Sequence, residues 1–157
     1  MNKTMERQFK LLKLYLPMRG HILDALKDED LSFQPKNLPS FSDILIQIGE
    51  WQGGYLDGFR NFSQDFSYRN EDPERATSLA KLRSWYEGMD EEIEAAIEMM
   101  SDEDVENRGI DRGGWEASVE WNLRIWQECL VIFYTKALVS FKLMGKEVPE
   151  SVAQWIE

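Results

Sequence analysis

The segment between Trp115 and Met144 constrains the fold most, because its apolar residues recur at alternating intervals of four and three. These residues are Val119, Leu123, Trp126, Leu130, Phe133, Ala137, Phe141 and Met144. This spacing places them along one side of an α-helix, as in the seam between packed helices. Gly145 is suited to end such a helix, and Pro149 prevents its continuation. The sequence therefore predicts a long helix over residues 115–144 that needs partner helices along one side.

Three further segments carry apolar residues at helical spacing. We expect helices over residues 4–26, 41–62 and 73–100. Pro17 removes a backbone donor within the first of them, so we expect a kink or a fresh start there. Ser40 is a good cap for the second helix. No segment alternates with the period of a strand, and residues 1–157 hold no linker that would divide domains. The sequence predicts a single all-α domain, folded as a four-helix bundle.

Four glycines lie within the second predicted helix, at positions 49, 53, 54 and 58. Each glycine costs a helix interior about 1 kcal/mol relative to alanine. We interpret them as a close helix crossing, where missing side chains let two backbones approach within the chain or across a dimer. The alternative is a weakly specified helix. Residues 101–114 are interpreted as a connection between the third and fourth helices.

Composition excludes several classes of partner. The net charge of −11 argues against a nucleic-acid backbone and against an anionic membrane surface, because both attract Lys and Arg. No apolar run is long enough to span a bilayer, and the first residues lack an apolar signal core. A single cysteine rules out an intramolecular disulfide. We expect a cytoplasmic protein without nucleic-acid or membrane partners.

The residue counts also limit metal and nucleophile chemistry. With one histidine, His21, and one cysteine, Cys129, the chain cannot build a tetrahedral Cys/His zinc site. Glu50 and Glu128 are the acids closest to the predicted interior, where they are candidate ligands for a hard cation such as Mg or Ca. The alternative is that both carboxylates lie in water at the border of the apolar stripes. Cys129 has no cationic neighbour in sequence, so we expect it to pack as a small hydrophobic residue.

Three segments resemble the DinB/YfiT-like superfamily. They are LSFQP at residues 31–35, FSDILIQI at residues 41–48 and SFKLMGKEVP at residues 140–149. The order of helices and loops is similar over nearly the whole chain. The resemblance implies a four-helix bundle that is often dimeric. Many members hold a divalent metal with three histidines, one early in the second helix and a His-x-x-x-His pair on the fourth.

The resemblance places these three ligand positions on Gln47, Cys129 and Phe133, counting back from Gly145 for the pair. All three histidines are thus replaced, and a phenyl ring cannot bind a metal. We expect no metal and no cofactor, and Phe133 is large enough to fill the vacated space. The candidate cleft residues are Gln47, Glu50, Trp51, Trp126, Glu128, Cys129 and Phe133.

Three functional hypotheses remain open from the sequence. The leading one is a DinB-like, metal-free binding or interaction protein that forms a homodimer, with a small-molecule ligand in the bundle cleft and no catalytic residue assigned. The second is a divalent-metal-dependent hydrolase or thiol-linked transferase with a carboxylate-rich site around Gln47, Glu50, Glu128 and Cys129. The third is a structural subunit with a filled cleft, whose apolar dimer surface uses the glycine-rich face of the second helix.

Overall fold

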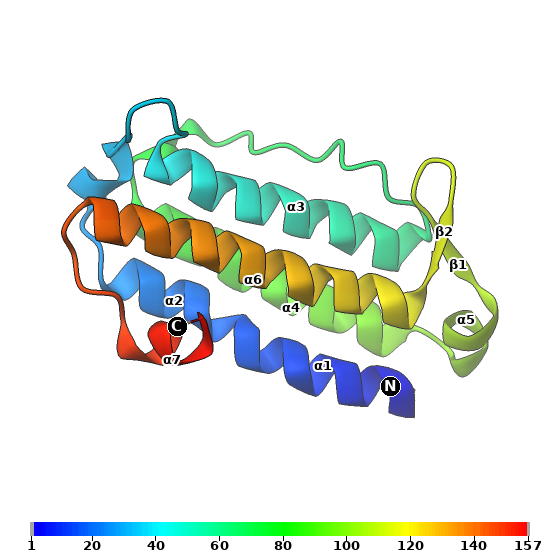
Figure 1. Cartoon of the computed structure of the whole chain (residues 1–157). Helices are drawn as coiled ribbons and strands as arrows, with labels where there is room; N and C mark the ends of the chain where they lie inside the picture. Colours follow the sequence, from blue (N-terminus) through cyan, green and yellow to red (C-terminus); the bar gives the residue numbers. More distant parts are fainter. Residues whose placement is uncertain (1, 157) are drawn as a thin grey trace.

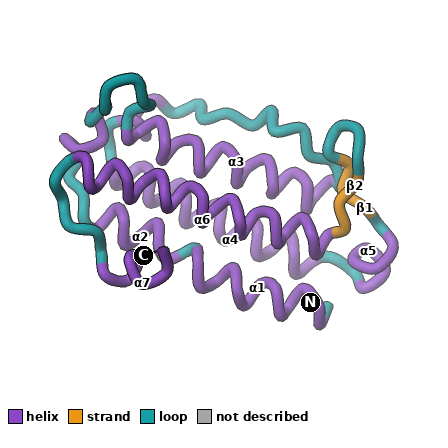
Figure 2. The backbone as a smooth tube through the Cα atoms, in the orientation of Figure 1, coloured by secondary structure: helices purple, strands orange, loops and turns teal. Residues whose placement is uncertain are grey.

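Long helices lying side by side make up most of the fold, as the computed structural model shows for residues 2–156 (Figures 1 and 2). They are α1 (Lys3–Tyr15), α2 (Pro17–Asp24), α3 (Phe41–Asn61), α4 (Leu79–Met99) and α6 (Val119–Leu143). Helix α3 packs between α4 and α6, α1 packs on α6, and α2 contacts both α4 and α6. None of the described helices combines the length and apolar character needed to cross a membrane. The predicted all-α class is confirmed for this part of the chain.

The connection between α3 and α4 determines their relative direction. It runs back along the length of α3, so α3 and α4 point the same way, whereas α1, α2 and α6 point the opposite way (Figure 1). The first part of this connection is fixed to a hairpin at the far end of the molecule. The amide of Gln64 donates to the carbonyl of Asp111 at 2.8 Å, and the amide of Asp111 donates to the carbonyl of Phe62 at 3.0 Å.

Local side-chain chemistry sets where the helices begin. Ser40 and Asp43 form a reciprocal capping box, with Asp43 N donating to Ser40 Oγ at 3.1 Å and Ser40 N donating to Asp43 Oδ2 at 3.0 Å. Pro17 opens α2, which confirms the break predicted in the first helix. Pro73 instead opens a short 3₁₀ turn, and α4 begins after its own cap, Ser78, six residues later than predicted from the proline.

Residues 101–114 were predicted only to connect two helices, but this segment contains regular structure. Helix α5 (Asp102–Asn107) is followed by β1 (Gly109–Asp111), which pairs antiparallel with β2 (Glu116–Ser118). Gly113 and Gly114 form the turn with φ values of +74° and +122°, which glycine adopts without strain. Strands of three residues are too short to show an alternating pattern, and β2 delays the start of α6. The remaining elements are η1 (Asp28–Ser32), η2 (Pro73–Ala76) and α7 (Glu150–Ile156).

The predicted apolar seam of α6 faces the core. Its members from Val119 to Phe141 are buried, and Met144 packs against the core with partial exposure. Phe41 at the start of α3 contacts Phe141 edge-on, with 5.7 Å between ring centroids. The core therefore extends along the whole length of α6.

Three of the four glycines of α3 face aromatic rings rather than the backbone of another helix, which corrects the sequence interpretation. Aromatic rings of other elements occupy the space that their side chains would take. The three pairs are Gly49 with Trp85 of α4, Gly53 with Tyr68 and Gly54 with Phe66, in which an added Cβ would lie 2.3, 2.3 and 2.8 Å from the ring. Two of these rings come from the connection between α3 and α4. Gly53 and Gly54 thus let that connection dock onto α3, and Gly49 accommodates Trp85 of α4.

Candidate binding site

The aromatic members of the predicted cleft meet between α3 and α6. The ring of Trp51 lies 5.5 Å from that of Phe133, and the ring of Tyr55 lies 4.9 Å from that of Trp126. The Tyr55 hydroxyl also lies 3.4 Å from the sulfur of Cys129. Tyr55 was not among the predicted site residues, although it links two of them. Phe133, Trp126 and Tyr55 are buried, so this region is packed with side chains.

The polar members of the predicted cleft lie apart from this aromatic group. Gln47 is exposed one turn before Trp51, so its side chain lies at the surface. Glu50 accepts a hydrogen bond from the amide of Asn70 at 3.0 Å. Glu128 is exposed and pairs with Arg124 on its own helix at 3.5 Å. Within residues 2–156, no group of three or more His, Cys, Asp or Glu side chains has an arrangement that could hold a metal ion.

The environment of Cys129 disfavours its thiolate. Burial raises the pKa of the Cys129 thiol, and the hydrogen bond from Tyr55 offsets this only in part. Burial likewise raises the pKa of the Tyr55 hydroxyl, and its contact with Cys129 adds to the effect. Both groups therefore stay protonated at neutral pH. Because the thiolate is the reactive form of cysteine, this geometry describes a packing role for Cys129 rather than a nucleophile.

A second region, which the sequence did not predict, forms an open pocket of about 500 Å³. Its walls come from α3, α4 and the connection between them, and none of the seven predicted site residues lines it. Gly88 leaves room inside it, Gly53 lies against the Tyr68 ring, and Trp85, Met89 and Leu56 provide its apolar surface. Its charged side chains are of both signs and come from all three walls: Asp57, Arg60, Asp72, Arg75, Lys81 and Glu92.

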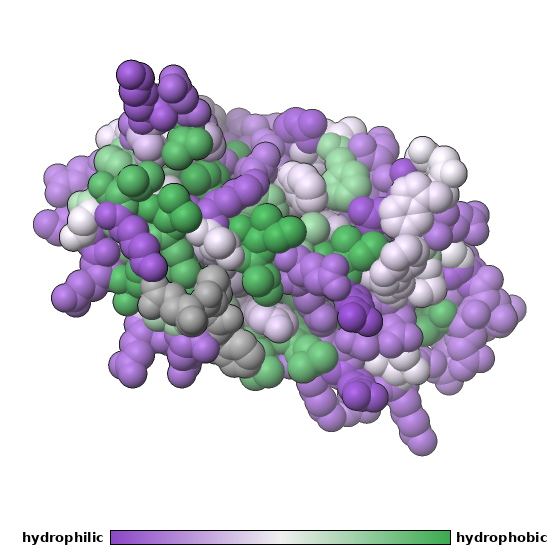
Figure 3. Space-filling view, viewed as in Figure 1, coloured by the Kyte–Doolittle hydropathy of each residue, from purple (hydrophilic) through white to green (hydrophobic). Residues whose placement is uncertain are grey.

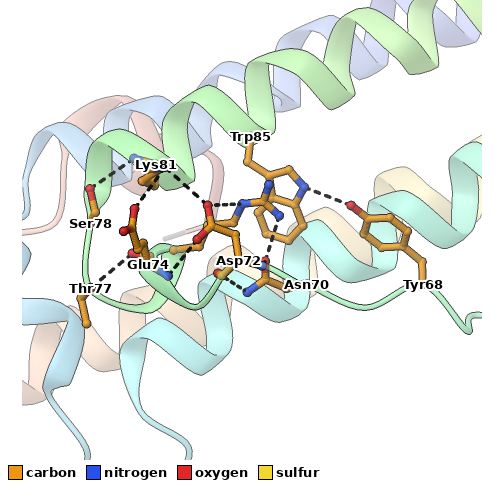
Figure 4. Close-up of polar contacts among 9 residues, drawn as sticks. Tyr68, Asn70, Asp72, Glu74, Thr77, Ser78, Lys81 and Trp85 are labelled. Carbon is orange, nitrogen blue, oxygen red and sulfur yellow. Dashed lines mark hydrogen bonds and ion pairs between the residues drawn. The ribbon is translucent and has the colours of Figure 1, made fainter.

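An aromatic pair forms one side of this pocket (Figure 4). The indole nitrogen of Trp85 donates to the Tyr68 hydroxyl at 3.3 Å. The Arg75 guanidinium lies 4.4 Å from the centre of the Trp85 ring, a cation–π contact, and donates to Asn70 Oδ1 at 2.8 Å. These contacts hold the connection against α4. The pocket wall is therefore fixed by side chains rather than by helix hydrogen bonds.

The rim of the pocket carries ion pairs. Lys81 lies 3.1 Å from Glu74 and 3.6 Å from Asp72, and the hydrogen bond to Glu74 raises the pKa of Lys81. On the other side, Arg60 of α3 pairs with Glu92 of α4 at 3.0 Å. All these groups are partly or largely exposed, so water screens their mutual attraction. They remain available to exchange one ionic partner for another.

The arrangement suits recognition of a polar molecule better than nucleophilic chemistry. Ser84 lines the pocket, but the only histidine of the chain, His21, lines a different depression between α2 and α4. A serine without an adjacent base is a weak nucleophile. The sequence holds one signal for this site, namely an aromatic residue, Tyr68, in a polar segment that follows the glycine-rich helix.

Comparisons with protein-family models, with characterised proteins and with solved structures find no match to this chain. The resemblance to the DinB/YfiT-like superfamily therefore stays a prediction that rests on the three sequence segments. The interpretation of the pocket rests on its own residues.

Proposed function

We propose that this chain is a DinB-like four-helix bundle without the family's metal site, and that it binds a small polar molecule in the pocket between α3 and α4. The long helices and their directions are compatible with such a bundle. The three family ligand positions hold Gln47, Cys129 and Phe133, and the last of these packs against Trp51. The proposal keeps the binding role predicted from the sequence but moves it to another pair of helices.

The pocket itself is the observation that carries the proposal. Its volume of about 500 Å³ falls within the range of about 300–1,000 Å³ that is usual for ligand sites. Its rim offers cations such as Arg60 and Lys81 to an acidic group and carboxylates such as Asp57 and Asp72 to a basic group. The Trp85 ring offers an apolar surface between them. The ligand class that fits this lining is a zwitterion of amino-acid size with an apolar portion.

The metal-dependent alternative has no specific observation in its favour. Glu50 accepts a hydrogen bond from the backbone amide of Asn70 in the connection, and Glu128 pairs with Arg124 at the surface of α6. Cys129 packs against Tyr55. The four residues of that hypothesis thus have separate environments.

Filling the pocket provides the test. Gly88 lines the pocket, and a Cβ added there meets no atom within 4 Å, so Gly88→Phe places a ring in the pocket without displacing the core. Thermal melts are recorded with a panel of amino acids and related zwitterions. We expect at least one compound to raise the melting temperature of the natural chain and to lose this effect in Gly88→Phe.

The matched control is Ala80→Phe, an exposed position of α4 that does not line the pocket. This variant keeps the ligand-induced shift. The proposal is wrong if no compound of the panel shifts the natural chain, or if the shift persists in Gly88→Phe. Isothermal titration with the best compound then distinguishes pocket binding from a general solvent effect, because only pocket binding has a defined stoichiometry.

A further inference from the structure

Helix α6 carries a second apolar stripe on the side away from its buried seam. Trp121, Ile132, Val139 and Leu143 are 52%, 56%, 48% and 54% exposed, and Ile125 is partly exposed. The space-filling view looks onto α6 and shows apolar side chains gathered over it, most densely toward its C-terminal end (Figure 3). A long helix with one apolar stripe in the core and another in solvent is typical of a surface that binds a partner.

The residues of this stripe follow a palindromic spacing centred on Ile132. Including the two charged residues between the apolar ones, the stripe consists of Trp121, Ile125, Glu128, Ile132, Lys136, Val139 and Leu143. The intervals are four, three and four residues before Ile132 and the same series after it. At 3.6 residues per turn these positions fall within an arc of about 80° on the helix. The stripe is therefore narrow, and its residue spacing is the same in both directions from Ile132.

A two-fold axis through Ile132 would place each residue of the stripe opposite a residue of compatible chemistry on a second copy. If two α6 helices meet antiparallel about this axis, apolar residues face apolar residues and Glu128 faces Lys136 of the second copy. The facing pairs are Trp121 with Leu143, Ile125 with Val139, Glu128 with Lys136, and Ile132 with its own copy. A parallel arrangement in register would instead set Glu128 against Glu128 and Lys136 against Lys136. Charge complementarity thus selects the antiparallel arrangement.

We infer that the outer stripe of α6 is the contact surface of a homodimer with two-fold symmetry, in which two α6 helices pair antiparallel about Ile132. An interface of this kind uses the same patch on both subunits, which is the symmetry that the palindrome supplies. The glycine-rich face of α3, the surface suggested by the sequence, is covered by the chain's own Trp85, Tyr68 and Phe66. Helix α6 has 25 residues and spans about 37 Å, enough for a continuous helix–helix contact.

The two charged residues are free to form this contact. The Glu128 side chain is 65% exposed and pairs with Arg124, one turn away on the same helix. Lys136 is exposed, with its Nζ 4.9 Å from the centre of the Phe133 ring. Such surface contacts are weak and give way to a partner across an interface. The α3–α4 pocket has no lining residue from α6, so dimer formation and ligand binding can be tested separately.

The first experiment measures the mass of the full chain in solution by light scattering after size exclusion. We expect the mass of two 18.4-kDa chains for the natural protein and of one chain for Ile132→Glu, which brings two like charges together on the axis. Met99→Glu is the matched control, because Met99 is 86% exposed on α4, and it stays dimeric. Circular dichroism verifies that both variants keep their helix content.

A charge exchange tests the register. Glu128→Lys or Lys136→Glu alone weakens the dimer by about tenfold or more in dissociation constant, and the double variant recovers most of the loss because the pair is re-formed with reversed sign. In a Cys129→Ser background, Ile132→Cys gives a covalent dimer when oxidised with copper phenanthroline. A monomeric natural chain, a dimer that tolerates Ile132→Glu, or a double variant as weak as the single ones would overturn the inference.

Discussion

Replacing one glycine of α3 with alanine tests the finding that aromatic rings occupy the glycine positions. Gly49→Ala adds a Cβ that would lie 2.3 Å from the Trp85 ring, whereas Gly88→Ala adds the same group to α4 with no atom within 4 Å. Both substitutions favour the helix by about 0.5–1 kcal/mol. Only Gly49→Ala also overpacks the core, at a cost of about 1–3 kcal/mol. We therefore expect Gly88→Ala to be stabilised and Gly49→Ala to be less stable than it by about 1–3 kcal/mol.

Urea denaturation followed by circular dichroism measures this difference. With a denaturant slope of about 2 kcal/mol per molar, a difference of about 2 kcal/mol separates the two midpoints by about 1 M. The same Gly49→Ala change in a Trp85→Leu background removes the clash, so there it is no longer destabilising, and the double-mutant cycle returns the overpacking energy. The reasoning is refuted if Gly49→Ala matches Gly88→Ala, or if its penalty persists without the indole.

Three other predictions concern buried or paired ionisable groups. Asp90→Ala leaves the buried Arg19 guanidinium without its ion-pair partner, so urea denaturation should show a free energy of unfolding lower by about 3 kcal/mol. Adding Arg19→Met to the same chain removes the unpaired charge and should restore most of this stability. Burial raises the pKa of Asp30, but the ion pair with Lys146 at 2.9 Å and the hydrogen bond from the Lys27 amide together outweigh this, so the net pKa is lowered. The stabilisation is present above the unfolded pKa of about 4 and is lost as the pH falls below it, and acid titration of Lys146→Met should show a smaller loss. Burial raises the pKa of Cys129, so iodoacetamide should modify the folded chain more slowly than the urea-unfolded chain at pH 8, and the rate for the folded chain should rise at a higher pH. Equal rates would contradict the burial argument.

The sequence predicted the long helices well because their signals are local. Apolar spacing and the Ser40 cap placed α3 within one residue of its observed bounds, at residues 41–62 against Phe41–Asn61. The seam of α6 was also correct, since its periodicity extends over many turns. Errors arose where two signals competed, as at Pro73, which suits the first turn of an α-helix but here begins a 3₁₀ turn. The hairpin was missed because three-residue strands carry too little pattern.

The candidate site was predictable only in part. The sequence predicted that Phe133 packs inside the bundle, and the structure places it against Trp51, while Tyr55 packs against Trp126. The pocket could not be derived, because it depends on which rings dock into the glycine positions of α3. That choice is made by tertiary packing between residues 12 to 36 positions apart, from Gly54 with Phe66 to Gly49 with Trp85. Residue spacing within one helix contains no information about it.

The connection between α3 and α4 also has a consequence for hydrogen exchange. Between Phe62 and Ser78 its backbone is mostly outside helices, and it is held by the β1 bridge at one end and by ring and guanidinium contacts along its length. Segments of this kind detach at a lower free energy than the helices that they cover. Its amides should therefore exchange in a cooperative group ahead of those of α3 and α4. Because Tyr68, Asp72 and Arg75 of this connection line the α3–α4 pocket, a molecule that binds there as proposed should slow the exchange of these amides.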